Sequence, residues 1–174
     1  MQILAGQYKS RRIITSSELP YRPTQTRIRK SLFDILGNLS GKTVLDLYAG
    51  SGILGFEAAS RGAAEITFVE MNRKMTNILH RNSSLFTNTI FHVENDSAES
   101  FLDTDELYDI IIADPPYELT EAKNGTTGKS LIDLCFNRLK LHGTFILEMS
   151  SKSDIKGDRE KYYGDTKLVF WNKY

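Results

Sequence analysis

Apolar and polar positions follow two rhythms along this chain of 174 residues. The segment TQTRIRKSLFDILGNL places Ile28, Leu32, Ile35 and Leu36 on one stripe at helical spacing, which predicts an amphipathic helix that ends at Gly37. Ahead of it, MQILAGQYKSRRIIT has two short β-prone runs on either side of a glycine, which predicts a small β-hairpin. We therefore expect the chain to open with a hairpin and a helix.

From Thr43 onward the pattern changes to short apolar runs that alternate with helical segments. The predicted strands are TVLDLYA, EITFVE, TIFHVEN, YDIIIAD and GTFILEMS, and the predicted helices are ILGFEAASR, NRKMTNILHRNSSLF, SAESFL and GKSLIDLCFNRL. This alternation is typical of an α/β fold whose mostly parallel sheet is covered on both faces. After Ser150 a polar stretch leads to TKLVFWNKY, a last strand that we expect to be antiparallel because no full helix precedes it.

The length fits a single domain over residues 1–174. We expect residues 1–40 to form a basic extension made of the hairpin and helix, and residues 41–174 to form the α/β core. No apolar run approaches the ~20 residues that a membrane span needs. The chain also opens without a signal-peptide pattern, so we expect a cytoplasmic protein without membrane contact.

Metal and disulfide chemistry is not expected. The single cysteine, Cys135, excludes an internal disulfide and a CxxC metal site, and it lies in a helical pattern that favours a buried apolar role. The three histidines do not gather at one place in the predicted fold, so no metal site is predicted.

Charge is distributed unevenly, although the whole chain has a net charge of zero. Residues 1–30 carry seven basic side chains and one acidic one, a net charge of +6, and the remaining 144 residues carry −6. A basic arm on an acidic body indicates contact with a polyanion. Two alternatives stay open, a solvated charged face and an arm docked on the acids of the body. The candidate phosphate contacts are Lys9, Arg11, Arg12, Arg22, Arg27, Arg29 and Lys30.

Polar side chains end four of the predicted strands. Ligands of open α/β sheets bind beyond the carboxyl ends of the strands, so these residues are expected to share one rim. They are Asp46, Glu70, Asp96, Ser97 and Asp114.

A glycine motif, Gly50-x-Gly52-x-x-Gly55, follows the first of these strands and opens a helix. It is compatible with a nicotinamide dinucleotide or with S-adenosylmethionine, and glycines can also serve a tight turn alone. Asp46 would meet the ammonium of S-adenosylmethionine but would repel a pyrophosphate, and no second domain remains for a hydride acceptor. The pattern therefore favours S-adenosylmethionine, with a nucleotide-binding oxidoreductase as the alternative.

Asp114-Pro115-Pro116-Tyr117 ends the fourth predicted strand. Prolines fix φ and remove N–H donors, which leaves a rigid edge of acceptors suited to an amino group. The Asp114 carboxylate and the Pro115 carbonyl could accept both N–H bonds of a base amine and localise its lone pair, while Tyr117 stacks on the base. The alternative is a plain turn after a strand.

These segments resemble a known family. LDLYAGSGILGFEAASRGA, FVEMN and DPPY resemble class I S-adenosylmethionine-dependent methyltransferases, and ILAGQYKSRRI with RPTQTRIRKSLFDIL resembles the RsmD family, which methylates a guanine N2 of 16S rRNA. The resemblance implies a Rossmann-like, seven-stranded, mostly parallel sheet with an antiparallel C-terminal strand and an N-terminal hairpin and helix. It implies catalytic roles for Asp114, Pro115, Pro116 and Tyr117, and cofactor contacts from Asp46, Ala49, Gly50, Ser51, Gly52, Glu70, Met71, Asp96 and Ser97.

The chain departs from that family's pattern in three places. Thr26 and Lys30 stand where the family commonly has acids, so this arm is more basic than usual. Ser97, rather than Asp96, aligns with the family residue that contacts the adenine amine, and either side chain could accept that hydrogen bond. The polar stretch 118–129 closes over the base or is a plain loop, and both interpretations stay open.

The resemblance names 16S rRNA as partner, within an assembling or assembled small subunit or as naked RNA, and we expect a monomer. Another amino-methyltransferase acting on DNA adenine or cytosine is the nearer alternative. The chain leaves no room for a sizeable DNA-recognition domain, which favours RNA. The sequence does not say which nucleotide is modified.

Overall fold

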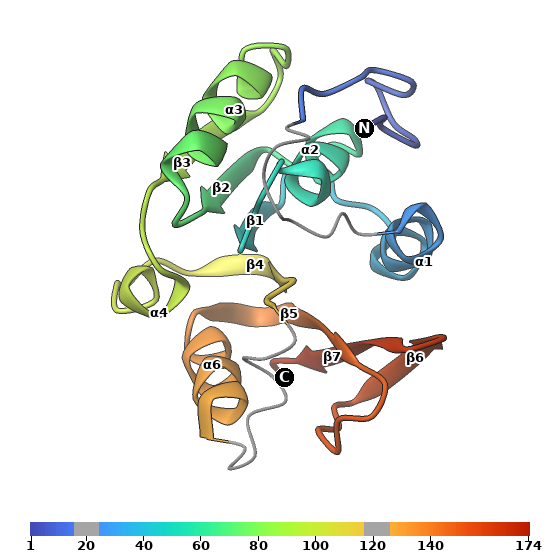
Figure 1. Ribbon diagram of the computed structural model, residues 1–174, viewed down its shortest axis with the longest axis vertical. Helices are drawn as coiled ribbons and strands as arrows, with labels where there is room; N and C mark the ends of the chain where they lie inside the picture. The colour runs from blue at the N-terminus through green and yellow to red at the C-terminus, as the bar shows by residue number, and fades with distance from the viewer. Residues whose placement is uncertain (16–24, 117–125) are drawn as a thin grey trace.

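The computed structural model describes residues 1–15, 25–116 and 126–174, with the side chains of residues 126–130 excepted. In chain order the elements are α1 (Thr26–Leu36), β1 (Thr43–Leu47), α2 (Ile53–Ser60), β2 (Glu65–Val69), α3 (Arg73–Ser83), β3 (Ile90–Glu94), α4 (Ala98–Phe101), β4 (Tyr108–Ala113), α6 (Thr126–Asn137), β5 (Leu139–Ser150), β6 (Arg159–Tyr163) and β7 (Thr166–Asn172). Strands and helices alternate from β1 to β5, as the sequence predicts (Figure 1).

The seven strands form one sheet in the order β3-β2-β1-β4-β5-β7-β6. Pairing is parallel from β3 through β5, while β7 is antiparallel to both β5 and β6. The mostly parallel sheet with an antiparallel C-terminal pair is therefore confirmed, and it is the class I methyltransferase fold. Because strand order reverses between β1 and β4, the carboxyl ends of these two strands flank the crevice in which such sheets bind ligands.

Strand β6 is missing from the sequence prediction, which treats the residues after Ser150 as a polar connection. Its segment REKYY has no buried residue, because it pairs with β7 along one side and forms the edge of the sheet. An edge strand that buries so little carries no apolar alternation to detect.

Alternate residues of the strands pack against helices on opposite faces of the sheet. Val44 joins a core with α1, α2 and α3, and Leu45 joins a second core with α4 and α6. Figure 1 shows α1 and α2 on one side of the strands and α4 and α6 on the other. Cys135 is fully buried in the second core, as its helical pattern predicts.

Two glycines of the motif serve packing inside the protein. A Cβ on Gly55 would lie 2.3 Å from Cε1 of Phe68, and a Cβ on Gly52 would lie 2.5 Å from Cδ2 of Leu79. Gly52 also has φ +78°, a left-handed conformation that L side chains adopt at a cost. The close packing of α2 against β2 requires a glycine at position 55, and the packing of α3 together with the positive φ requires one at position 52.

Residues 1–15 form a chain reversal rather than a regular hairpin. One antiparallel bridge joins Gln2 to Arg12, and the amide of Ile3 donates to the carbonyl of Arg11 at 2.9 Å. Gly6 turns with φ +84° directly against Ser60 at the end of α2, where a Cβ would lie 1.8 Å from the carbonyl oxygen. The predicted pair of strands is therefore reduced to a single bridge, because the segment bonds to helices more than to itself.

A buried carboxylate fixes this segment. Glu57 of α2 is fully buried and accepts the amides of Leu4 and Ala5 at 2.8 and 3.1 Å and Nε of Arg61 at 2.9 Å. Arg29 of α1 is also buried, with its Nε 3.8 Å from a Glu57 carboxylate oxygen and its Nη2 donating to the carbonyl of Gln2. Residues 2–5 are thus docked on α1 and α2 by hydrogen bonds between their backbone and the charged side chains of Arg29 and Glu57.

The division between an extension at 1–40 and a core at 41–174 stays a prediction. Among the described residues, no helix has the length and apolar character needed to cross a membrane.

Candidate active site

The carboxyl ends of four neighbouring strands form one row. Register pairs Leu47 of β1 with Val69 of β2 and with Ala113 of β4, and Val69 with Glu94 of β3. The polar groups that follow these residues therefore lie along a single rim, as the sequence predicts. The predicted cofactor and target residues in the described part of the chain come from these four strand ends.

Asp46 lies one residue before the end of β1 and is 2% exposed. One carboxylate oxygen accepts the amide of Gly55 at 2.9 Å, which holds the start of α2 to the strand. Burial raises the pKa of Asp46 well above its usual range, the Gly55 amide lowers it, and the charges of Asp114 and Glu70 raise it further. Asp46 therefore lies close enough to Asp114 and to Glu70 to feel the negative charge of each.

Glu70 joins two turns with its two oxygens. One accepts the amide of Gly50 in the glycine loop at 2.8 Å, and the other accepts the amide of Asn72, which caps α3, at 2.8 Å. A carboxylate has about four acceptor positions, so both oxygens keep capacity for a further donor. Met71, the next residue, exposes 75% of its side chain, which leaves a flexible apolar surface beside Glu70.

The third strand end is organised by Asn95, a residue that the sequence analysis does not single out. Its side-chain amide donates to the carbonyls of Glu70 and Met71, both at 2.9 Å, and so ties the end of β3 to the end of β2. Asp96 and Ser97 bind the first turn of α4: Asp96 accepts the amide of Ser97 at 2.8 Å, and the Ser97 hydroxyl accepts the amide of Ser100. Asp96 and Ser97, the two residues predicted to contact the adenine, therefore follow the end of β3 at the rim.

The loop after β1 contains a strained residue that the sequence did not reveal. Tyr48 has φ +57°, rare for a bulky side chain, and its hydroxyl donates to Glu99 of α4 at 3.0 Å. The loop is held by the amide of Ala49 donating to the carbonyl of Val69 at 3.1 Å. Ser51 is almost fully buried inside it. Strain that the surroundings hold in place is common where a backbone must meet a ligand.

The fourth strand end carries the motif that the sequence analysis assigns to the target base. Asp114 is half-buried, Pro115 is buried and Pro116 is exposed. Tyr117 lies outside the described residues. The motif follows Ala113 directly, so Asp114 lies next to the end of β1 and across from Asp46, whose pKa it raises.

The described basic residues of the arm lie in two different parts of the structure. Lys9, Arg11 and Arg12 are exposed beside the far ends of α2 and α3, where Tyr8 binds Ser60 and Thr87, so they lie at the amino edge of the sheet. Arg27 and Lys30 are exposed on α1. Arg22 lies outside the described residues.

The prediction that Arg29 contacts phosphate is wrong. Its side chain is 3% exposed and faces Glu57, because the N-terminal segment covers the part of α1 that would otherwise meet solvent. The alternative raised for the arm, pairing with acids of the body, holds for this residue.

A family model described as Conserved hypothetical protein 95 matches residues 1–172. The chain belongs to this family. It is 35% identical over 119 residues to Ribosomal RNA small subunit methyltransferase D of Escherichia coli (strain K12), an alignment that covers 67% of this chain and 60% of that protein. It is 34% identical over 165 residues to the protein of the same name from Buchnera aphidicola subsp. Acyrthosiphon pisum, covering 88% and 80%. The resemblance to the RsmD family is thereby confirmed.

A solved structure is similar to this protein over nearly the whole chain. The structure of yhhF from Escherichia coli, described as a methyltransferase candidate, superposes with a TM-score of 0.85 at 27% identity and covers 99% of this chain and 97% of that one. The first curated relatives are matched over less than two thirds of their own length, 60% for the Escherichia coli K12 protein.

Proposed function

We propose that this protein transfers the methyl group of S-adenosylmethionine to a guanine N2 of small-subunit (16S) ribosomal RNA. The observation that carries the proposal is the convergence of Asp46, Glu70 and Asp114 at the crevice between β1 and β4. Family membership and the names of the relatives support ribosomal RNA as the substrate.

The chemistry of these donors fits S-adenosylmethionine. Asp46 is buried and its pKa is raised by burial and by two neighbouring carboxylates, so the site gains free energy when a cationic ligand enters. The cofactor carries an ammonium and a sulfonium, whereas a dinucleotide would bring two phosphates into the same field. The charge of the rim therefore opposes the oxidoreductase alternative.

Each rim residue has a task in this proposal. Glu70 accepts the ribose hydroxyls, and Met71 lies against the adenine, which suits its exposed thioether chain. Asp96 or Ser97 accepts the adenine amine. Ala49, Gly50, Ser51 and Gly52 form the loop along the cofactor. The Glu70 carboxylate holds this loop at Gly50, and Asn95 in turn binds the carbonyl of Glu70.

At the target, Asp114 and the carbonyl of Pro115 accept the two N–H bonds of the guanine amine. This localises the nitrogen lone pair, which is otherwise delocalised into the ring. Tyr117 stacks on the base and sets its plane. S-adenosylmethionine supplies the methyl group from its sulfonium. The protein's contribution is to hold the amine in line with it, which is a matter of position more than of proton transfer.

We propose that the protein acts in the cytoplasm as a monomer on RNA that is naked or within an assembling or assembled small subunit. Within the described residues, no group of three or more His, Cys, Asp or Glu side chains is arranged to hold a metal ion.

Transfer of tritium from labelled S-adenosylmethionine tests the proposal. We expect label in small-subunit ribosomal RNA and none in DNA of equal length, and label at guanine N2 after digestion to nucleosides. Label in DNA would favour the alternative amino-methyltransferase. Calorimetric titration that detects NAD binding but no S-adenosylmethionine binding would contradict the methyltransferase assignment.

A further inference from the structure

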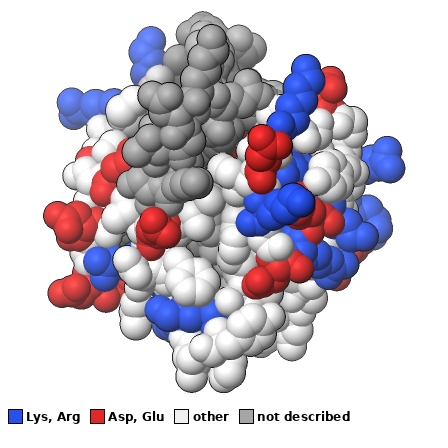
Figure 2. Space-filling model, turned by 90° about the horizontal axis from the view of Figure 1, so that it is seen from below, with Lys and Arg blue, Asp and Glu red and all other residues white. Residues whose placement is uncertain are grey.

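An open hollow of about 390 Å³ lies between α1 and the end of β6. Its lining includes three cations and one carboxylate, which are Arg27, Lys30, Lys161 and Asp34. Figure 2 shows basic side chains, with acidic ones among them, on the flank where Figure 1 places β6. A concave surface with a net positive charge suits an anionic ligand.

The walls of the hollow are held in place by contacts between the two elements. The hydroxyl of Tyr163 donates a hydrogen bond to the hydroxyl of Ser31, which joins β6 to α1. The guanidinium carbon of Arg27 lies 5.9 Å from the centre of the Tyr163 ring. Because Tyr163 and Lys161 are two residues apart in a strand, their side chains leave β6 toward the same face. These contacts join the two walls of the hollow, and Lys161 extends from β6 on the face that meets α1.

Two of the cations are available to a ligand. Lys30 pairs with Asp34 at 2.9 Å, and both side chains are more than half exposed. In the part of the chain that the structure describes, no carboxylate forms an ion pair with Arg27 or Lys161. Arg27 also lies in the first turn of α1, where the helix dipole disfavours a cation, so helix stability does not explain its presence.

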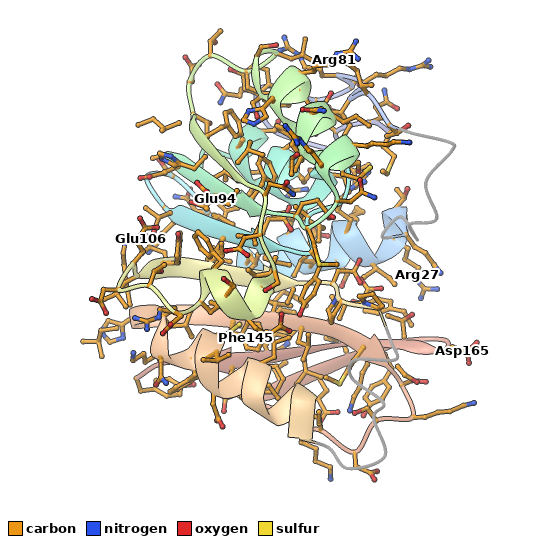
Figure 3. The ribbon with its side chains drawn as sticks, turned by 60° about the vertical axis from the view of Figure 1, so that its left-hand side comes forward. Arg27, Arg81, Glu94, Glu106, Phe145 and Asp165 are labelled. Carbon is orange, nitrogen blue, oxygen red and sulfur yellow. The ribbon has the colours of Figure 1, made fainter. Side chains whose placement is uncertain are left out.

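The hollow opens on the same edge of the sheet as the proposed target site. Tyr163 pairs with Thr166, Thr166 pairs with Ser150 of β5, and β5 ends beside β4, where Ala113 pairs with Leu147. Strand β6 therefore ends at the carboxyl edge, three strands from Asp114, or about 14 Å at the usual strand spacing. Figure 3 shows Arg27 on the side of the β6–β7 turn, at Asp165, and Glu106 on the opposite side.

We infer that this hollow binds backbone phosphate of the RNA next to the target nucleotide, with Arg27 and Lys161 as its principal contacts. The inference rests on the proposed function. An RNA strand with one base at Asp114 would carry its neighbouring phosphates along this edge, and the hollow offers a concave basic surface there. The sequence analysis did not find Lys161, because its partner element lies more than a hundred residues earlier in the chain.

Two substitutions that should change RNA affinity in opposite directions test the inference in the full-length protein. Binding of a small-subunit ribosomal RNA transcript is measured across salt concentrations for Lys161→Glu and Asp34→Asn. Losing one phosphate contact should reduce the slope of log affinity against log salt by about 0.7–0.9 and weaken binding about fivefold near 0.1 M salt. Asp34→Asn should strengthen binding and steepen the slope, because it frees Lys30 and removes a repelling charge.

A matched control uses Lys156→Glu, the same charge change at an exposed residue that is not part of the hollow's lining. This variant should bind RNA with the same salt slope as the parent protein. Lys161→Glu should keep its melting temperature and its affinity for S-adenosylmethionine, because Lys161 is exposed and lies away from the cofactor rim.

The possible failures are distinguishable. If the parent protein methylates the RNA, yet Lys161→Glu and Asp34→Asn bind it with the parent's affinity and slope, the hollow does not hold phosphate and the proposed function stands. If Lys161→Glu impairs methylation of ribosomal particles but not binding of naked RNA, the hollow contacts a protein, and the phosphate assignment is wrong. If the parent protein transfers no methyl group to ribosomal RNA, the proposed function itself fails.

Discussion

The carboxylate of Glu70 bonds to the backbone amides of Gly50 and Asn72, each at 2.8 Å. One side chain at the end of β2 thus sets the glycine loop after β1 and the first turn of α3. An acid at this position is expected to hold the ribose of the proposed cofactor, and the structure shows that it also shapes the loop around it.

Substitution of Glu70 should weaken cofactor binding. We expect Glu70→Ala to lower the binding free energy of S-adenosylmethionine by about 1.5–3 kcal/mol, because a charge-assisted contact is lost. Calorimetric titration measures this, with thermal melting to separate loss of the loop from loss of the ligand contact. Glu65→Ala, at the opposite end of β2, should leave the affinity unchanged. Equal affinities for Glu70→Ala and the parent protein would contradict the placement of Glu70.

Cofactor affinity should rise with pH because of Asp46. Burial and two neighbouring carboxylates raise the pKa of Asp46 in the free protein, so a proton must leave before a cationic ligand gains its full attraction. Affinity should therefore increase as pH rises through that pKa and level off above it. Titrations in buffers of different ionisation heat would detect the released proton, and Asp46→Asn should abolish the release. A pH-independent affinity would show that Asp46 stays ionised without ligand.

Removal of the Asp114 carboxylate should stop catalysis while the protein stays folded. We expect Asp114→Asn to lose most methyl transfer and to keep its affinity for S-adenosylmethionine, because the side chain addresses the target amine. The matched control is Asp109→Asn on β4, the strand that Asp114 follows, where Asp109 binds Lys42, Lys140 and Thr43. That variant should melt at a lower temperature with normal activity per folded molecule. Full activity of Asp114→Asn would rule out the proposed role.

The ring of Tyr117 should matter more than its hydroxyl. Stacking of a base on an aromatic side chain is worth about 1–3 kcal/mol, so Tyr117→Ala should be severe and Tyr117→Phe mild. Methyl transfer to RNA measured at limiting substrate would reveal the difference. Equal damage from the two changes would assign the role to the hydroxyl and contradict stacking.

Substitution of Arg12 should change RNA binding but not stability, and substitution of Arg29 should change stability but not RNA binding. Arg12 is exposed, so Arg12→Gln should reduce the salt slope of RNA binding by about 0.7–0.9 and leave the melting temperature unchanged. Arg29→Met should leave the slope unchanged. It should destabilise the protein by about 1–3 kcal/mol, because the carbonyl of Gln2 loses its donor, while Arg61 still pairs with Glu57. Binding across salt concentrations, together with thermal melting, checks both. An unchanged slope for Arg12→Gln would indicate that the arm is scaffold.

Local patterns predicted much of the fold and the rim. The helix that ends at Gly37 forms as expected, and Gly37 adopts φ +71° at its end. The strands from β1 to β5 follow from their apolar runs. Their predicted parallel order places Asp46, Glu70 and Asp114 at one edge, because each residue lies at or next to the end of a strand and strand ends of a parallel sheet coincide.

The sequence by itself thus determined the α/β fold, the rim and the chemistry that the rim favours, because periodicity, glycine turns and strand-end motifs are properties of neighbouring residues. The tertiary structure decided which charged residues are buried and which lie together on the surface. It buried Arg29 against Glu57, and it brought Arg27 and Ser31 of α1 to Lys161 and Tyr163 of β6, a contact between residues 132 positions apart in the chain. It also made an edge strand of the polar REKYY segment. Burial of a charge and the meeting of distant elements depend on packing between segments, which no local pattern contains.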